Sequence, residues 1–215
     1  MPVKVIVGAQ WGDEGKGKIA DYLARQADVA VRFQGGDNAG HTVVNPYGSF
    51  KLHIVPCGIF NPRAVSLIGA GTVVNPDVLL EELDALEAAG VPTQGLRVSS
   101  RATLIMPWHI DMDALMEKAG GIGTTRRGIG PAYAGRAMRT SLRFEDLLDP
   151  YYAAERLRRT LPDINRELAA LGGAPYSPDE ALDRCRRWAD RLAGRVVDAV
   201  PYLHACLGEG KRVLF

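Results

Sequence analysis

Two glycine-rich segments near the N-terminus carry residue types suited to binding phosphate. The first, Gly12 to Lys18, reads GDEGKGK and follows a short apolar run. Its glycines let backbone N–H groups approach phosphate oxygens closely, and its lysines supply point charges. A helix expected directly after it adds the positive end of its dipole. This position between a strand and a helix predicts a phosphate-binding loop.

The first segment departs from an ordinary P-loop at one position. Gly12, Gly17 and Lys18 satisfy the spacing Gly-x-x-x-x-Gly-Lys, but residue 19 is isoleucine. An ordinary P-loop has Ser or Thr there, whose hydroxyl holds magnesium. Another oxygen donor must therefore hold the cation, and the Asp13 carboxylate inside the loop is the candidate.

The second segment, Gln34 to Thr42, reads QGGDNAGHT and follows the next expected strand. The carboxyl ends of parallel strands meet at one sheet edge, so both segments should enclose a ligand from two sides. His41 has the chemistry of a general acid or of a donor to developing phosphoryl charge. A lone loop histidine is more often structural, but its position beside a phosphate loop favours a functional role.

A third segment, Thr124 to Pro131, combines hydroxyls with arginines, and Arg136, Arg139 and Arg143 follow it. Guanidinium groups bind a phosphate monoester bidentately. On spacing alone, a solvated basic loop and helix is the better interpretation. The glycine content of residues 120–130 predicts a mobile or ligand-ordered loop.

Alternating apolar patterns and turn signals place these segments in an α/β fold. We expect a buried strand at Val3 to Val7, a helix at Lys16 to Gln26 and a strand at Val29 to Phe33. Further expected elements are a hairpin from residues 43–45 and 50–54, a strand at 64–68 and a helix that starts at Asn75-Pro76 and ends at Gly90. The pattern predicts a P-loop-like, mostly parallel sheet flanked by helices.

The rest of the chain predicts a helical lobe. Residues 1–135 form the nucleotide-binding α/β part, residues 136–210 the mainly helical lobe, and residues 211–215 the start of a strand. In the lobe, an apolar stripe recurs at three- and four-residue steps, formed by Leu182, Cys185, Trp188, Ala189, Leu192 and Val196. Because a strand begins at the last residues, we expect the sheet to be incomplete and the chain to stop inside a domain.

The composition fits a soluble cytoplasmic protein. The chain has 215 residues, of which 47% are hydrophobic, and a formal net charge of +1. This balance gives no basic surface for nucleic acid, and no apolar run is long enough to span a membrane. Cys57, Cys185 and Cys206 lack the spacing of a zinc site or a disulfide framework, so we expect reduced thiols.

Three stretches together resemble the adenylosuccinate synthetase family: QWGDEGKGK from Gln10, QGGDNAGHT from Gln34 and GTTRRGIGPAY from Gly123. The resemblance runs along essentially the whole chain. It implies a Mg²⁺-dependent ligase of purine biosynthesis, which uses GTP to join IMP and L-aspartate through 6-phosphoryl-IMP. It also implies a homodimer.

The resemblance implies roles for individual residues. Asp13 would take the N1 proton of IMP and bind Mg²⁺ together with the Gly40 carbonyl, and His41 would stabilise the phosphoryl group in transfer. The implied GTP contacts are Gly12, Asp13, Glu14, Gly15, Lys16, Gly17, Lys18, Gly40, His41 and Thr42. The implied IMP contacts are Asp13, Glu14, Gly15, Lys16, Asn38, Ala39, Gly40, His41, Thr125 and Arg139, with Arg139 reaching the neighbouring subunit. Asp37 and Arg126 sit at positions whose residue type varies in the family, so no role is attached to either.

Members of the family continue for as much chain again, with guanine and aspartate recognition in that second half. We therefore expect these 215 residues alone not to complete the reaction. Two alternatives stay open at this stage. One is another P-loop phosphotransferase or NTPase, which would hydrolyse ATP without IMP. The other is a nucleotide-binding fragment without turnover.

Overall fold

The fold is built on a parallel sheet, as the sequence predicts. The computed structural model describes residues 3–9 and 15–215. Across these residues the strand order is β1-β9-β2-β5-β6-β8, with β7 paired to the far end of β5, and every pairing is parallel. The strands are β1 (Val3–Lys4), β2 (Val29–Gly35), β5 (Val65–Val74), β6 (Leu96–Ser99), β7 (Thr103–Leu104), β8 (Val196–Val197) and β9 (Val213–Leu214).

The predicted hairpin is confirmed. Strands β3 (His41–Asn45) and β4 (Gly48–Leu52) form a separate antiparallel pair, in which His41 opposes Leu52 and Asn45 opposes Gly48. The hairpin begins at the end of the second glycine-rich segment, so its register fixes the position of the His41 backbone.

Helices flank the sheet on both faces and at one end. They are α1 (Lys16–Ala24), α2 (Pro76–Ala88), α3 (Pro107–Lys118), α4 (Ile129–Met138), α5 (Pro150–Ala170), α6 (Pro178–Leu192) and α7 (Ala199–Gly208). The start of α2 is as predicted, because the Asn75 side chain accepts a hydrogen bond from the Asp77 N–H at 3.0 Å. Gly90 follows its end with a φ of 78°.

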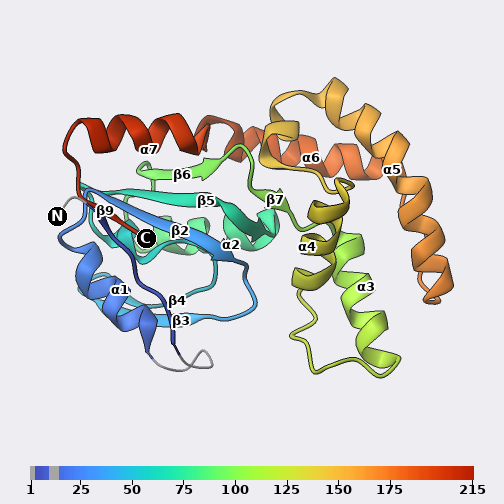
Figure 1. The fold of residues 1–215 in the computed structure, drawn as a ribbon, viewed down its shortest axis with the longest axis horizontal. Helices are drawn as coiled ribbons and strands as arrows, with labels where there is room; N and C mark the ends of the chain where they lie inside the picture. The colour runs from blue at the N-terminus through green and yellow to red at the C-terminus, as the bar shows by residue number, and fades with distance from the viewer. Residues whose placement is uncertain (1–2, 10–14) are drawn as a thin grey trace.

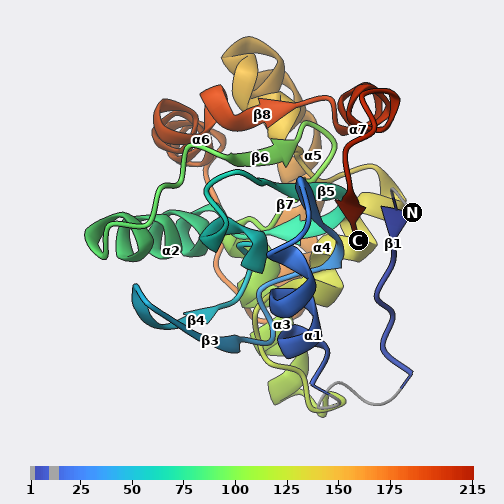
Figure 2. The same ribbon diagram turned by 90° about the vertical axis from the view of Figure 1, so that its left-hand side faces the viewer.

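Side chains alternate between the two faces of the sheet. On one face Val29, Val31 and Leu67 pack with Ala199 and Cys206 of α7. The opposite face packs against α1, α2 and the hairpin, so α7 and α1 lie on opposite sides of the sheet (Figure 2). Helices α3, α4 and α5 gather beside the sheet (Figure 1).

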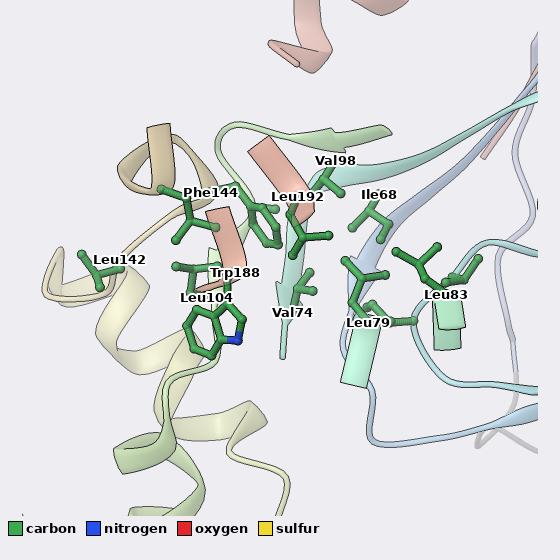
Figure 3. Close-up of a cluster of buried hydrophobic side chains, with 14 of the residues drawn as sticks. Ile68, Val74, Leu79, Leu83, Val98, Leu104, Leu142, Phe144, Trp188 and Leu192 are labelled. Atoms are coloured by element: carbon green, nitrogen blue, oxygen red, sulfur yellow. The ribbon is translucent and has the colours of Figure 1, made fainter. Parts of the chain in front are cut away.

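The predicted apolar stripe of α6 joins the helices to the sheet. Leu182, Cys185, Trp188 and Leu192 are all buried. Ala189 is half-buried, and Val196 lies beyond the end of the helix, in β8. Trp188 lies beside Leu104, and Leu192 lies near Val74 and Val98 of the sheet, within one core cluster (Figure 3). All three cysteines are buried and free of disulfide bonds. In the described part of the chain, no helix is both long and apolar enough to cross a membrane.

Strand β5 extends beyond the predicted residues 64–68. It continues through Gly69 and Gly71, where the backbones of β2 and β5 approach each other closely. A Cβ atom at residue 71 would lie 2.1 Å from the carbonyl oxygen of Phe33. Only glycine fits this approach, and the strand therefore reaches the end of β2.

The prediction of a buried strand at residues 3–7 is wrong. Only Val3–Lys4 is assigned as strand, and Val5 and Val7 are 60% and 75% exposed. The cause is the position of β1 at the sheet edge, where it pairs only with β9. The last backbone hydrogen bond of this ladder runs from the Ile6 N–H to the Phe215 carbonyl at 2.7 Å.

A carboxylate ties the last strand into the sheet. Asp28, directly before β2, accepts hydrogen bonds from the Arg212 backbone N–H, Nε and Nη2 at 2.8, 3.0 and 2.9 Å. These bonds lower the pKa of Asp28 to about 2. A carboxyl with a lowered pKa stabilises the fold above its ordinary pKa and loses that contribution as it is protonated.

We predict that Asp28→Asn lowers the free energy of unfolding by about 1 kcal/mol at pH 7, since the pair is open to solvent. The difference from wild type should shrink as the pH falls from 3.8 toward about 2. Urea unfolding over this pH range measures it, with Asp183→Asn, in an exposed helical pair with Arg186, as the control. A difference that is independent of pH would contradict the assignment.

Candidate phosphate-binding site

The two glycine-rich segments meet at one edge of the sheet. Gly15, with a φ of 83°, precedes the first residue of α1, and Gly17 lies in the first turn of that helix. A Cβ atom at residue 17 would lie 3.1 Å from the Cβ of His41, so the imidazole packs directly on the helix backbone. The expected meeting of the segments is thus observed for the residues described. Gly12, Asp13 and Glu14 lie outside the described residues.

His41 has one ring nitrogen in an unusual state. Its Nε2 atom is buried and has no hydrogen-bond partner within residues 3–9 and 15–215. Burial lowers the pKa of His41, and the positive charge of Arg32 adds to the effect. The imidazole is therefore neutral near pH 7, and one of its nitrogens can donate a hydrogen bond.

Arg32 fixes the turn that leads to His41. This half-buried side chain donates from Nη2 to the Gly36 carbonyl and from Nη1 to the His53 carbonyl. It thereby joins the start of the second glycine-rich segment to the end of the hairpin. Sequence reasoning missed Arg32, although a charged residue within an otherwise apolar strand is a signal that it has buried partners.

The hairpin supports the other end of this segment. A Cβ atom at Gly40 would lie 2.8 Å from both His53 Cε1 and Lys51 Cε. His53 is itself held by a buried carboxylate on α2. Glu82 accepts hydrogen bonds from the backbone N–H groups of His53, Ile54 and Val55, at 2.9 Å for Val55. Burial raises the pKa of Glu82 despite these bonds.

We predict that Glu82→Ala lowers the free energy of unfolding by about 3 kcal/mol, because it leaves buried backbone N–H groups without acceptors. The neighbouring exposed residue supplies the control, and Glu81→Ala should stay within about 0.5 kcal/mol of wild type. Chemical denaturation of both variants measures these free energies of unfolding. Equal stabilities would show that Glu82 does not anchor the hairpin.

Helix α4 brings the third segment to the same sheet edge. The Tyr133 hydroxyl donates to the Gly71 carbonyl and accepts from the Gly35 N–H, both at 2.9 Å. At the start of α4, a Cβ atom on Gly36 would meet Ile129 Cδ1 at 2.5 Å. Between α4 and the ends of β2 and β5 lies a hollow of about 480 Å³, lined by Phe33, Gln34, Gly35, Gly71, Tyr133 and Arg136. Tyr133 is thus a positioning residue that sequence reasoning did not single out.

The loop before α4 is exposed at its tip but fixed at its base. Thr125 and Arg126 are exposed, and Arg126 has a φ of 55°. Arg127 lies 3.7 Å from the buried carboxylate of Asp37, so an ion pair links this loop to the second glycine-rich segment. Sequence reasoning left Asp37 without a role, and burial raises its pKa.

Of the remaining predicted site residues, three lie beside His41 and one lies at the far end of α4. Asn38, Ala39 and Thr42 are exposed and flank Gly40 and His41 within one segment. Arg139 is exposed and ends α4 in a left-handed conformation with a φ of 64°. It lies at the opposite end of α4 from Ile129, about 15 Å along the helix axis. Among the described residues, Arg139 therefore lies at the end of α4 away from Gly36 and the rest of the second glycine-rich segment.

Together these residues form an edge of the sheet whose chemistry suits an anion. A helix N-terminus with glycines, exposed lysines in its first turn and a neutral imidazole suits a phosphate group. Its position at the carboxyl ends of parallel strands is typical of nucleotide sites in α/β proteins. The fold and this edge thus define the class of phosphate-loop α/β proteins.

Comparison with known proteins identifies the group within this class. The profile of the family described as adenylosuccinate synthetase matches residues 5–215. This chain belongs to the adenylosuccinate synthetase family. Adenylosuccinate synthetase 1 of Methanosarcina acetivorans is 52% identical over all of this chain and 51% of its own length. The enzyme of Dehalococcoides mccartyi is 46% identical over 52% of its length.

Solved structures show the same relationship. Fully ligated adenylosuccinate synthetase from Plasmodium falciparum matches with a TM-score of 0.84 and 32% identity, over 99% of this chain and 50% of that one. Cyanophage S-2L succinoaminodeoxyadenylate synthetase, bound to dGMP and dATP, matches with a TM-score of 0.59 and 27% identity, over 99% and 49%. The chain spans about half the length of the relatives it matches.

Proposed function

We propose that this chain forms the IMP- and phosphate-binding part of an enzyme that uses GTP to join IMP and L-aspartate into adenylosuccinate. The observation that carries the proposal is the packing of His41 on Gly17, which puts two glycine-rich segments at one sheet edge. Family membership over residues 5–215 supports the same reaction. The reaction proceeds by transfer of the GTP γ-phosphoryl group to O6 of IMP, followed by displacement of phosphate by the amine of aspartate.

Phosphoryl transfer requires mainly positioning and charge stabilisation from the protein. In our proposal Asp13 accepts the N1 proton of IMP, so that O6 becomes the nucleophile. His41 donates a hydrogen bond to a phosphate oxygen through its buried Nε2 atom, which has no partner in the described part of the chain. Gly15 to Lys18, at the start of α1, and Gly12 to Glu14 hold the phosphates of GTP, and Thr42 adds a contact.

Magnesium fits the donors that the sequence offers. Among the described residues no group of three His, Cys, Asp or Glu side chains could hold a metal. Mg²⁺ does not need such a group, because it binds through one or two protein oxygens together with substrate phosphates and water. The Asp13 carboxylate and the Gly40 carbonyl would supply those oxygens. The bound ion would neutralise charge on the phosphates.

IMP would lie against Asn38, Ala39 and Thr125, near the same segments. We further propose a homodimer in which Arg139 reaches the neighbouring subunit, because Arg139 follows the last residue of α4, at the opposite end of the helix from Ile129. The expected location is the cytoplasm.

We predict that the purified 215-residue chain binds IMP but forms no adenylosuccinate, since relatives use about twice this length. Calorimetric titration with IMP, with dGMP as a control ligand, tests binding. A spectrophotometric assay with GTP and aspartate tests turnover. Hydrolysis of ATP in the absence of IMP, or no binding of IMP, would contradict the proposed function. Adenylosuccinate formation would contradict the need for a second half.

In a longer protein that carries this chain, Asp13→Ala and His41→Asn should each lower turnover by at least about two orders of magnitude. Both groups act on the atoms that change charge in the reaction. Steady-state kinetics measures kcat, and His204→Asn, at an exposed position on α7, serves as the control. Near-normal kcat in either test variant would remove that residue from the mechanism.

A further inference from the structure

Two carboxylates on α3 bind the backbone of the loop that carries Thr125. Asp113 is 4% exposed, and its two oxygens accept hydrogen bonds from the Thr124 hydroxyl and the Gly128 N–H, both at 2.8 Å. One helical turn later, Glu117 accepts from the Gly123 N–H at 2.9 Å and from the Thr124 N–H at 3.0 Å. Residues four apart share one helix face, so this face of α3 holds both ends of the loop.

The loop backbone also packs closely against α3 at Gly128. Gly128 has a φ of 74°, and a Cβ atom there would lie 2.9 Å from the His109 carbonyl carbon and from the Ile110 nitrogen. The Thr124 N–H bond is the main cause that lowers the pKa of Glu117, so Glu117 stays ionised at neutral pH. Hydrogen bonds to an ionised carboxylate are stronger than those between neutral groups.

This arrangement restricts what the loop can offer a ligand. The N–H groups of Gly123, Thr124 and Gly128 already donate to protein carboxylates. They are therefore not available to a phosphate. The exposed side chain of Thr125 lies between these anchored positions, so its place is fixed from both sides.

We propose that Asp113 and Glu117 are positioning residues, which hold residues 123–128 in the shape that presents the Thr125 side chain to the nucleotide. The inference rests on the proposed function, since IMP is the nucleotide concerned. It adds two residues with no contact to substrate, which act by ordering the loop before binding. Pre-organisation raises affinity because the ordering entropy is not lost on binding.

The test uses Asp113→Asn and Glu117→Gln in the 215-residue chain. Each change keeps the size of the side chain but removes one acceptor. Asp111→Asn is the matched control, because Asp111 is on the same helix and accepts from Tyr176 rather than from the loop. Amide hydrogen exchange by NMR reports each anchored N–H separately, and calorimetry reports the affinity for IMP.

Glu117→Gln should speed exchange about tenfold at Gly123 and Thr124, and Asp113→Asn should do so at Gly128. Each variant should also weaken IMP binding several-fold, whereas the control changes neither quantity. If Asp113→Asn does not fold, Glu117→Gln still tests the proposal at Gly123 and Thr124. Unchanged exchange at these amides, or faster exchange with unchanged IMP affinity, would overturn the proposal. Wild-type chain that binds no IMP would instead contradict the proposed function, while the exchange data still show whether the carboxylates hold the loop.

Discussion

The arrangement of the site depends on the direct contact between the His41 side chain and the backbone at Gly17. A Cβ atom at residue 17 would lie only 3.1 Å from the Cβ of His41. Because residue 17 has no side chain, the first turn of α1 and the start of β3 can touch. This contact brings the two glycine-rich segments together at one edge of the sheet, where we propose that an anion binds.

Buried polar side chains maintain this contact from behind. Arg32 binds carbonyls on both sides of the segment, and Glu82 binds the N–H groups at the hairpin end. Burying charged groups is unfavourable unless they are hydrogen-bonded, so these residues stabilise one particular arrangement of the loops. Tyr133 and the Asp37–Arg127 pair extend the same network to the loop before α4. Hydrogen bonds and an ion pair therefore link the three segments, although they are far apart in sequence.

Much of the fold follows from local patterns in the sequence. Strand β2, the hairpin and the start of α2 are found where alternation, turn residues and the Asn75 cap predict them. The order of strands is not local information. Strand β9 lies between β1 and β2, so the last residues of the chain separate the two strands of the predicted βαβ unit. The exposure of Val5 and Val7 has the same origin, since burial depends on which strand lies beside them.

The glycine-rich segments could be recognised from sequence because phosphate binding demands particular residue types at particular spacing. The residues that support these segments could not be recognised, because the role of the half-buried Arg32 or the buried Glu82 depends on partners that the sequence does not reveal. The sequence indicates only that such a residue has buried partners, because it places a charge on an apolar surface. Glu82, which lies beside Leu79 and Leu86 on α2, is an example. The most direct test of the central claim is a crystal structure of a longer protein that carries this chain, with IMP, Mg²⁺ and a non-hydrolysable GTP analogue. We predict a phosphate oxygen within hydrogen-bond distance of His41 Nε2, beside the first turn of α1. A triphosphate bound elsewhere, with His41 turned away from it, would contradict the account.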